Sequence, residues 1–339
     1  MTKLEIINGS FYINNIKTNK NNNLSEGKLI GIYTDICAFY DKNLNFDIYK
    51  NKIDFINNLK IWRKSGINLI TVGLQSPNPF DEYYKKAREQ DKTKNISFNS
   101  SALNSNGSLN YNYLENACEI INAANNLGFI VLLNILSSSC EDIFEDEFAL
   151  INGVLNITDW LLMQNFSNVL VNITDVSHTF YKSSVLSGEK TINILKTVRE
   201  KAKNKIILGM GIKSFTNFSE KNIDEYINLS DFIPFYQKQN HNTGKMLENI
   251  YFFKSKMQKL NIKIPLIMAK GDDLDEKYNS YGKNNLIEAL ENGVSWCYYD
   301  KDGFVILPVD WDKDSSAEKR RFFEVVRNNY NLNYSSNTR

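Results

Sequence analysis

The sequence predicts an α/β protein: a (β/α)8 TIM barrel with a short N-terminal β-hairpin. Short, almost continuous apolar segments alternate with amphipathic helical segments eight times along the chain. Continuous apolar strands separated by helices are typical of a parallel sheet whose faces are covered by helices. Gly209-Met210-Gly211 lacks the third glycine of a dinucleotide-binding turn, so the pattern favours a closed barrel over an open Rossmann sheet.

The first 27 residues predict the hairpin and a loop. Asn8-Gly9 is a two-residue turn signal between Ile6-Ile7 and Phe11-Tyr12-Ile13, which is the arrangement expected of two antiparallel strands. The polar, asparagine-rich residues 17–27 then predict a loop.

The barrel elements follow in order. Several predicted helices end at a glycine just before the next apolar segment, as at Gly66 and Gly128, because glycine adopts the left-handed helix stop without steric cost. The predicted strands are residues 29–36, 68–74, 129–135, 169–173, 206–210, 232–235, 265–269 and 294–299. The predicted helices are residues 48–64, 113–127, 147–164, 191–203, 223–229, 246–260, 286–291 and 317–328.

The composition fits one globular domain, with residues 28–330 as the barrel and residues 331–339 as a tail. Apolar residues make up 42% of the chain and charged residues 23%, enough for a large core. The net charge of +1 argues against nucleic-acid and membrane partners. We find no signal peptide and no segment near the roughly 20 apolar residues of a membrane span. We therefore expect a cytoplasmic protein or part of a larger assembly.

The functional residues of such barrels lie on loops at the C-terminal ends of the strands. Each candidate there also has a structural interpretation: an Asp pairs with a neighbouring base or caps a loop, and a Trp packs in the barrel. His178 and His241 are the two histidines and lack matched carboxylate spacing, so we predict no metal and no cofactor. The candidates are Gln75, Asp175, His178, Tyr236, Asp272, Asp273, Trp296 and Tyr298.

Several segments resemble glycoside hydrolases of the cellulase-like clan. Residues 62–68 (WRKSGIN) followed by Gly73-Leu74-Gln75 resemble the second unit of that family, and residues 159–162 and 168–171 resemble its approach to strand four. The C-terminal segments GVSWCYYD (293–300), DGF, PVDW and KRRFF are the strongest part of the match. The resemblance covers nearly the whole chain and implies a TIM barrel with a carbohydrate-facing cleft.

The chain departs from the clan where the resemblance implies catalysis. Clan members end strand four with Asn-Glu, the acid/base, and strand seven with a nucleophilic Glu, and retaining chemistry places these carboxyls about 5–5.5 Å apart. The alignment puts Asp175 at the Asn position and Val176 at the acid position, although a shift of one residue makes Asp175 the acid. In Lys270-Gly271-Asp272-Asp273, Gly271 takes the nucleophile position, provided that one extra residue is present within residues 265–269.

Three hypotheses follow. The first is a non-catalytic carbohydrate-recognition or structural module, with a protein partner if the role is structural; the second is an active glycosidase that hydrolyses O-glycosidic bonds with Asp175 and Asp272 or Asp273. A barrel enzyme of unrelated chemistry is the third, because fold alone does not determine function. We favour the first, since Asp is one methylene shorter than Glu. The resemblance implies sugar contacts for Trp296, Gln75, Tyr236, His178 and Tyr298.

Overall fold

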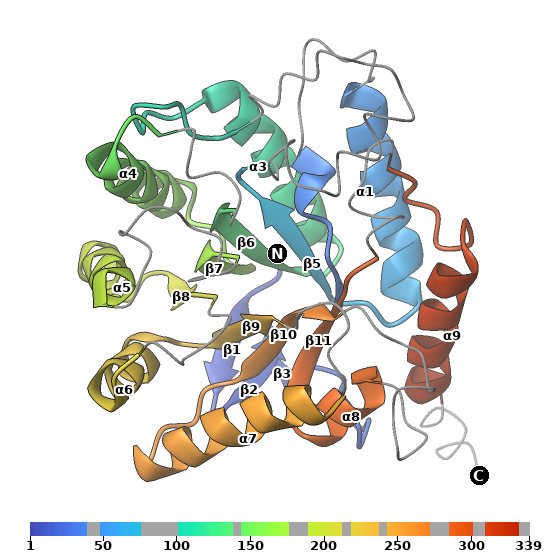
Figure 1. Ribbon diagram of the computed structural model, residues 1–339. Helices are drawn as coiled ribbons and strands as arrows, with labels where there is room; N and C mark the ends of the chain where they lie inside the picture. Colours follow the sequence, from blue (N-terminus) through green and yellow to red (C-terminus); the bar gives the residue numbers. More distant parts are fainter. Residues whose placement is uncertain are drawn as a thin grey trace.

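Eight parallel strands form a nearly closed barrel surrounded by helices (Figure 1). The computed structural model describes residues 1–38, 48–75, 101–137, 144–175, 189–211, 218–236, 243–271, 285–300 and 309–331. The strands are β4 (Ile30–Ile32), β5 (Leu69–Gly73), β6 (Ile130–Leu136), β7 (Val169–Thr174), β8 (Ile207–Gly209), β9 (Ile233–Tyr236), β10 (Leu266–Gly271) and β11 (Val294–Tyr298).

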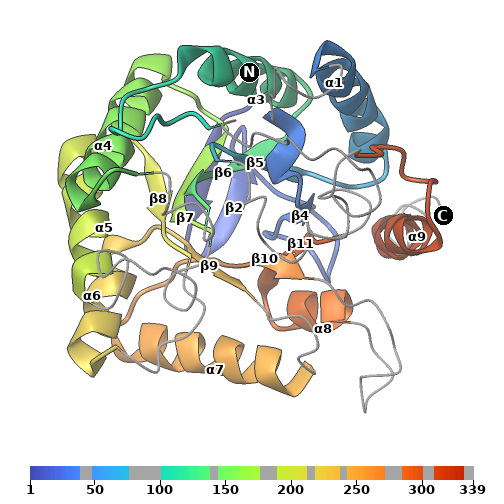
Figure 2. The ribbon, with the colours of Figure 1, turned by 45° about the horizontal axis from the view of Figure 1, so that its top comes forward.

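The strand order around the barrel is β8-β7-β6-β5-β4-β11-β10-β9. The two ends of this sheet meet where the Asp231 N–H, just before β9, donates to the Leu208 carbonyl of β8 at 2.8 Å. Seen from a second direction, the helices form a ring around the strands (Figure 2). The predicted barrel is therefore confirmed.

The helices follow the strands in alternation, as the amphipathic segments predict. Two of them, α1 and α4, have the bounds expected from the sequence, and the others differ by one to three residues at their ends. The helices are α1 (Ile48–Lys64), α3 (Tyr111–Asn126), α4 (Glu147–Gln164), α5 (Glu189–Ala202), α6 (Glu220–Leu229), α7 (Thr243–Lys259), α8 (Asn285–Glu291) and α9 (Ala317–Asn331). Within the described residues, no helix is long and apolar enough to span a bilayer.

Two apolar cores result from the alternation of side chains along each strand. One cluster fills the barrel interior and includes Leu132, Leu170 and Cys297. The second lies between the strands and the helices and includes Val131, Val171 and Trp296. Because neighbouring residues of a strand face opposite sides, successive residues join different cores, as Val131 and Leu132 of β6 do.

The N-terminus forms a small antiparallel sheet at the N-terminal ends of the barrel strands. β1 (Leu4–Ile7) pairs with β2 (Ser10–Ile13), and β3 (Ile16–Lys17) adds a third strand to the predicted hairpin. The Leu4 N–H donates to the carbonyl of Ser167, which precedes β7. Phe11 is fully buried in the interior cluster, so this sheet closes the barrel at the end opposite the strand C-termini.

The first barrel strand falls furthest short of its predicted length. The apolar run at residues 29–36 predicts a strand throughout, but the structure ends β4 at Ile32 and turns Asp35–Ala38 into a short 3-10 helix, η1. The Thr34 N–H donates to the hydroxyl of Thr71 on β5 at 2.7 Å, and the Thr34 hydroxyl donates to the Thr71 carbonyl. These side-chain hydrogen bonds replace the strand pairing and carry Asp35 into the barrel mouth.

Candidate functional site

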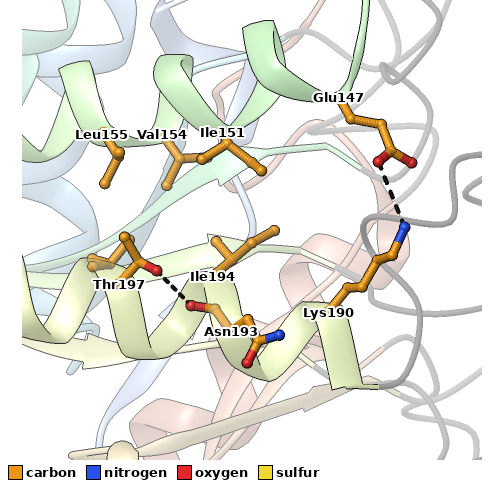
Figure 3. Close-up of a pocket in the computed structure, with 9 residues that line it drawn as sticks. Glu147, Ile151, Val154, Leu155, Lys190, Asn193, Ile194 and Thr197 are labelled. Atoms are coloured by element: carbon orange, nitrogen blue, oxygen red, sulfur yellow. Dashed lines mark hydrogen bonds and ion pairs between the residues drawn. The ribbon is translucent and has the colours of Figure 1, made fainter.

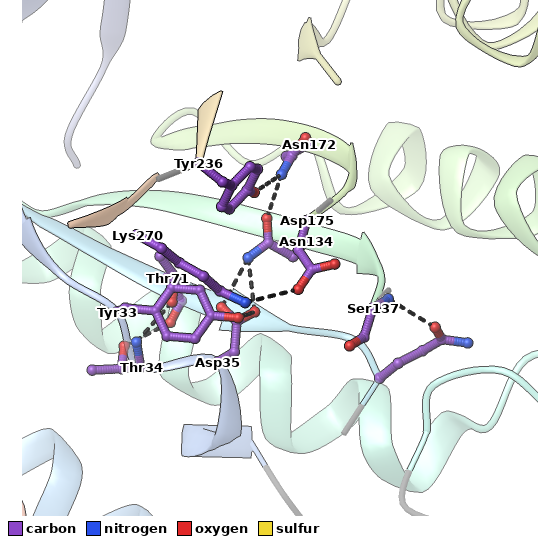
Figure 4. Close-up of polar contacts among 11 residues, drawn as sticks. Tyr33, Thr34, Asp35, Thr71, Asn134, Ser137, Asn172, Asp175, Tyr236 and Lys270 are labelled. Atoms are coloured by element: carbon purple, nitrogen blue, oxygen red, sulfur yellow. Dashed lines mark hydrogen bonds and ion pairs between the residues drawn. The ribbon is translucent and has the colours of Figure 1, made fainter. Parts of the chain in front are cut away.

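The candidate site is a hydrogen-bonded cluster at the C-terminal ends of the strands (Figure 4). The Asn134 amide on β6 donates to both carboxylate oxygens of Asp35, at 2.9 and 2.8 Å. The Asn172 amide on β7 donates to the Asn134 side-chain oxygen at 2.6 Å and to the Tyr236 hydroxyl on β9 at 2.9 Å. The Gly211 N–H donates to the Asn172 side-chain oxygen at 2.7 Å. The cluster thus links five segments across the barrel.

Lys270 is the cation at the centre of the cluster. Its Nζ donates to Asp175 Oδ2, at the end of β7, at 3.1 Å. The same Nζ lies 4.5 Å from the ring centroid of Tyr33, 5.6 Å from that of Tyr299 and 5.7 Å from that of Tyr236. A cation within about 6 Å of an aromatic face is attracted by the ring quadrupole, so Asp175 and three tyrosines together hold the ammonium.

A one-residue bulge in β10 turns Lys270 into the barrel. From Met268 to Gly271, β10 advances three residues while the neighbouring β11 advances two, from Trp296 to Tyr298. Ala269 belongs to the interior cluster, and regular alternation would make the next residue face the helices. The bulge instead lets Lys270 face inward as well, because it breaks the alternation.

Asp35 is a member of the site that sequence reasoning missed. It was assigned to a strand end and not to the candidate set, yet its carboxylate is buried and accepts a hydrogen bond from the Tyr33 hydroxyl at 2.6 Å. The signal available in the sequence was a charged residue within an otherwise apolar strand segment, since a buried charge needs partners. Its partner Asn134, and Asn172, which donates to Asn134, also interrupt apolar strands.

Burial and neighbouring charges shift the acidities of the cluster. Burial raises the pKa of Asp35, against the opposing effects of hydrogen bonds from Thr71 and Tyr33 and of the Lys270 charge. Burial would lower the pKa of Lys270, but the charges of Asp175, Tyr299 and Asp35 outweigh it and raise that pKa above its usual range. Burial, with Asp35 and Asp175, raises the pKa of Tyr33. Lys270 therefore stays an ammonium and Tyr33 a hydrogen-bond donor.

The structure brings some of the predicted site residues together. Asp175 and Tyr236 contact Lys270. Gln75 lies just after β5, and its side-chain oxygen accepts from the Ser137 N–H at 3.0 Å. Among the described residues, the buried Gln75 amide nitrogen has no hydrogen-bond partner. Val176, His178, Asp272 and Asp273 lie outside the described residues. Within the part of the chain that the structure describes, no three His, Cys, Asp or Glu residues are grouped to hold a metal.

Trp296 and Tyr298 do not face the barrel mouth. Trp296 is 0% exposed and belongs to the cluster between the strands and the helices. Tyr298 is buried in the same cluster and stacks on Phe322 of α9, with ring centroids 4.3 Å apart. The expectation that these two rings contact a sugar therefore needs correction: they alternate with Cys297, whose side chain faces the interior, so both face the helices. Both residues pack in the outer core, which is the structural alternative to a sugar contact.

Gly271 also faces away from the mouth. A β-carbon built on Gly271 would lie within 2.1 to 2.5 Å of three Trp296 ring atoms. A side chain at position 271 would thus point at Trp296 in the outer core. On β10, the side chain that points toward Asp175 is that of Lys270. The sequence alignment, which put Gly271 at the nucleophile position facing the cleft, is therefore off by one residue in this structure.

A separate cavity of about 250 Å³ lies between helices α4 and α5 (Figure 3). Ile151, Leu155 and Ile194 are among its apolar walls, and the Glu147–Lys190 ion pair, 3.5 Å between charged atoms, lies at one end. Pockets for small molecules usually measure about 300–1,000 Å³ and present a few convergent polar groups. This cavity is smaller and contains none of the Lys270 cluster, so the strand ends remain the candidate site.

Comparison with known proteins places the fold among glycoside hydrolases. No protein-family model matches the sequence, and no curated protein sequence does. The structure is similar to a family 5 mannosidase from Rhizomucor miehei, with a TM-score of 0.57, 11% identity and 99% of each chain covered. It is also similar to an endo-1,4-β-mannanase from the same organism, with a TM-score of 0.58, 10% identity and coverage of 98% of this chain and 99% of the other.

A bacterial structure has the same architecture. The endo-1,4-β-D-mannanase from Thermotoga petrophila matches with a TM-score of 0.55 and 11% identity, over 90% of this chain and 99% of the other. At these identities the likeness establishes the fold. The chain thus has a TIM-barrel fold similar to that of these enzymes, and its structural neighbours include family 5 glycoside hydrolases, as the sequence resemblance predicts.

Proposed function

We propose that this protein is a glycoside-hydrolase-like barrel that does not cleave glycosidic bonds and acts as a carbohydrate-recognition or structural module. The observation that supports it best is the ion pair between Lys270 and Asp175. Retaining hydrolysis needs two carboxyl groups about 5–5.5 Å apart, one as nucleophile and one as acid. Here the β10 side chain that points toward the end of β7 is the Lys270 ammonium, and it donates to an Asp175 oxygen.

A protonated lysine cannot take the part of the carboxylate nucleophile. An ammonium carries three donors and no lone pair, and the raised pKa of Lys270 keeps it in that form. Asp175 is 3% exposed, so its carboxylate is committed to the buried ion pair. These properties support the proposal that the barrel mouth does not carry out hydrolysis by a pair of carboxylates.

Recognition of a saccharide is supported by the neighbours and by the polar floor of the mouth. One neighbour is a mannosidase in complex with mannosyl-fructose, and others are mannanases. Gln75 contributes a buried amide nitrogen without a partner. An unsatisfied buried donor costs about 1–3 kcal/mol, and a ligand oxygen would remove that cost.

The test is hydrolysis and binding by the purified full chain. We expect no product from aryl glycosides or from manno-, gluco- and xylo-oligosaccharides, and retention of a saccharide on a glycan array with a Kd of about 1 mM, which corresponds to roughly 4 kcal/mol. Hydrolysis that disappears in Asp175→Asn, in Asp272→Asn or in Asp273→Asn, but persists in the surface control Glu200→Gln, would establish the active glycosidase instead. If the chain showed neither hydrolysis nor saccharide binding, the structural role would remain as its function.

A further inference from the structure

At the described part of the mouth, the Lys270 side chain is partly exposed, while the two carboxylates near it are buried. The Lys270 side chain is 22% exposed, whereas that of Asp175 is 3% exposed and Asp35 is buried. Tyr299, which flanks the ammonium at 5.6 Å, is partly exposed as well. A ligand that approaches the described part of the mouth therefore meets a cation beside an aromatic ring.

We propose that the saccharide recognised at this mouth is anionic, with a carboxylate or sulfate group that pairs with Lys270 while its ring lies against Tyr299. This inference rests on the carbohydrate-recognition part of the proposed function and names the ligand class. Uronic acids and sulfated sugars share the required chemistry, namely a negative oxygen cluster attached to a ring with an apolar face.

The geometry of the ammonium leaves room for a second acceptor. Lysine has three N–H donors, and among the described residues the acceptor in hydrogen-bond contact with Nζ is Asp175 Oδ2 at 3.1 Å. The rings of Tyr33, Tyr236 and Tyr299 lie 4.5 to 5.7 Å from Nζ and attract it as a cation, which leaves its other N–H groups for a ligand acceptor. An ammonium that bridges a buried carboxylate and a ligand carboxylate makes a second charge-assisted hydrogen bond, a stronger type than a neutral one.

The buried carboxylates of Asp175 and Asp35 repel a bound anion only weakly. Asp175 is neutralised by its direct contact with Lys270. Asp35 is turned toward Tyr33 and Asn134, whose donors occupy both of its oxygens, and burial raises its pKa. A cationic amino sugar, by contrast, would place like charges together at Nζ, which costs free energy in a desolvated site.

The experiment compares matched ligands by isothermal titration calorimetry and saturation-transfer NMR. The ligands are glucuronate and mannuronate oligosaccharides, glucose and mannose oligosaccharides of the same length and linkage, and a sulfated galactose oligosaccharide. We expect the wild-type chain to bind an anionic ligand at least tenfold more tightly than its neutral counterpart, and to lose most of this preference at 0.5 M salt. The uronate and sulfate arms distinguish the two sources of negative charge.

The variants separate loss of the ligand contact from loss of the fold. Lys270→Met with Asp175→Asn removes both members of the ion pair, so the buried Asp175 carboxylate is not left without its ammonium. The melting curve of the double variant verifies folding. We expect this double variant to bind anionic and neutral ligands equally, Lys270→Arg to retain the preference, and the exposed control Lys60→Met to behave as wild type. A preference that survives in the double variant would overturn the inference.

The outcomes also distinguish this inference from the proposed function. Equal binding of neutral and anionic sugars by the wild-type chain would overturn the anionic ligand and leave carbohydrate recognition intact. Absence of binding to every saccharide would overturn both. Hydrolysis of a bound sugar would overturn the non-catalytic role, while the ratio of anionic to neutral affinities would still decide the ligand class.

Discussion

Gly271 lies directly against the indole ring of Trp296: a β-carbon on residue 271 would be 2.1 Å from Cζ2 of that ring. The ring is fully buried between the strands and the helices, so it has little freedom to move aside. This contact explains why β10 carries a glycine at this point, and it turns any side chain at position 271 away from the barrel mouth.

Substitution Gly271→Ala is expected to destabilise the protein by about 1–3 kcal/mol, the usual cost of inserting extra atoms into a packed core. Urea denaturation of both proteins measures the difference in free energy of unfolding. In a Trp296→Leu background the same substitution is expected to cost less, because the overlapping ring atoms are gone, with a coupling of about 0.5–3 kcal/mol. Equal costs in the two backgrounds would contradict the contact.

Truncation of Trp296 is expected to act on stability. Trp296→Ala removes a fully buried side chain and should lower the free energy of unfolding by about 3–5 kcal/mol, visible as a large drop in Tm. Trp296→Phe should cost less, since it keeps ring volume and removes an indole N–H that is buried without a partner. Tyr111→Ala, at an exposed site, is the control. Nearly unchanged stability of Trp296→Ala with lost glycan binding would instead mark a sugar platform.

Removal of one member of the Lys270–Asp175 pair is expected to cost more than removal of both. Lys270→Met leaves the buried Asp175 carboxylate without its cation, and breaking a buried pair in this way typically costs about 3–5 kcal/mol. Adding Asp175→Asn should recover part of the loss, because it removes the buried carboxylate that Lys270→Met leaves without its ammonium. Chemical denaturation at pH 7 of the wild type, both single variants and the double variant completes the cycle. Additive losses would show that the two groups do not interact.

Asp35 is expected to make stability fall as pH rises. Burial raises the pKa of Asp35 in the folded state, so the folded protein holds this proton more tightly than the unfolded chain, whose Asp pKa is about 3.9. Between the two pKa values the folded state binds more protons, and the free energy of unfolding therefore decreases as pH increases. The cost is absent below the unfolded pKa and complete above the folded one.

The measurement is the free energy of unfolding of wild type and Asp35→Asn between pH 3.5 and 7. The stability of the variant relative to wild type should rise through this window and level off once Asp35 is ionised in the folded protein. Glu200→Gln, on the exposed face of α5, should give no such rise. A relative stability that falls with pH would mean that the partners of Asp35 lower its pKa below that of the unfolded chain.

The sequence by itself determined the barrel and most of its helices. Apolar strand segments, amphipathic helices and glycine stops report local geometry directly, so α1 and α4 have the predicted bounds. The N-terminal turn at Asn8-Gly9 likewise marks the two predicted strands. Asp175 and Tyr236 could be nominated because residues at strand ends must meet at one end of a barrel.

Tertiary structure alone decided which side chains enter the mouth. Strict alternation along β10 would turn Lys270 toward the helices, and the bulge after Met268 turns it inward against Asp175. Asp35 enters because the chain leaves β4 early to bond with Thr71. A shift of one residue moves a side chain to the opposite face of a sheet, and such shifts depend on pairing with neighbouring strands, which local sequence does not encode.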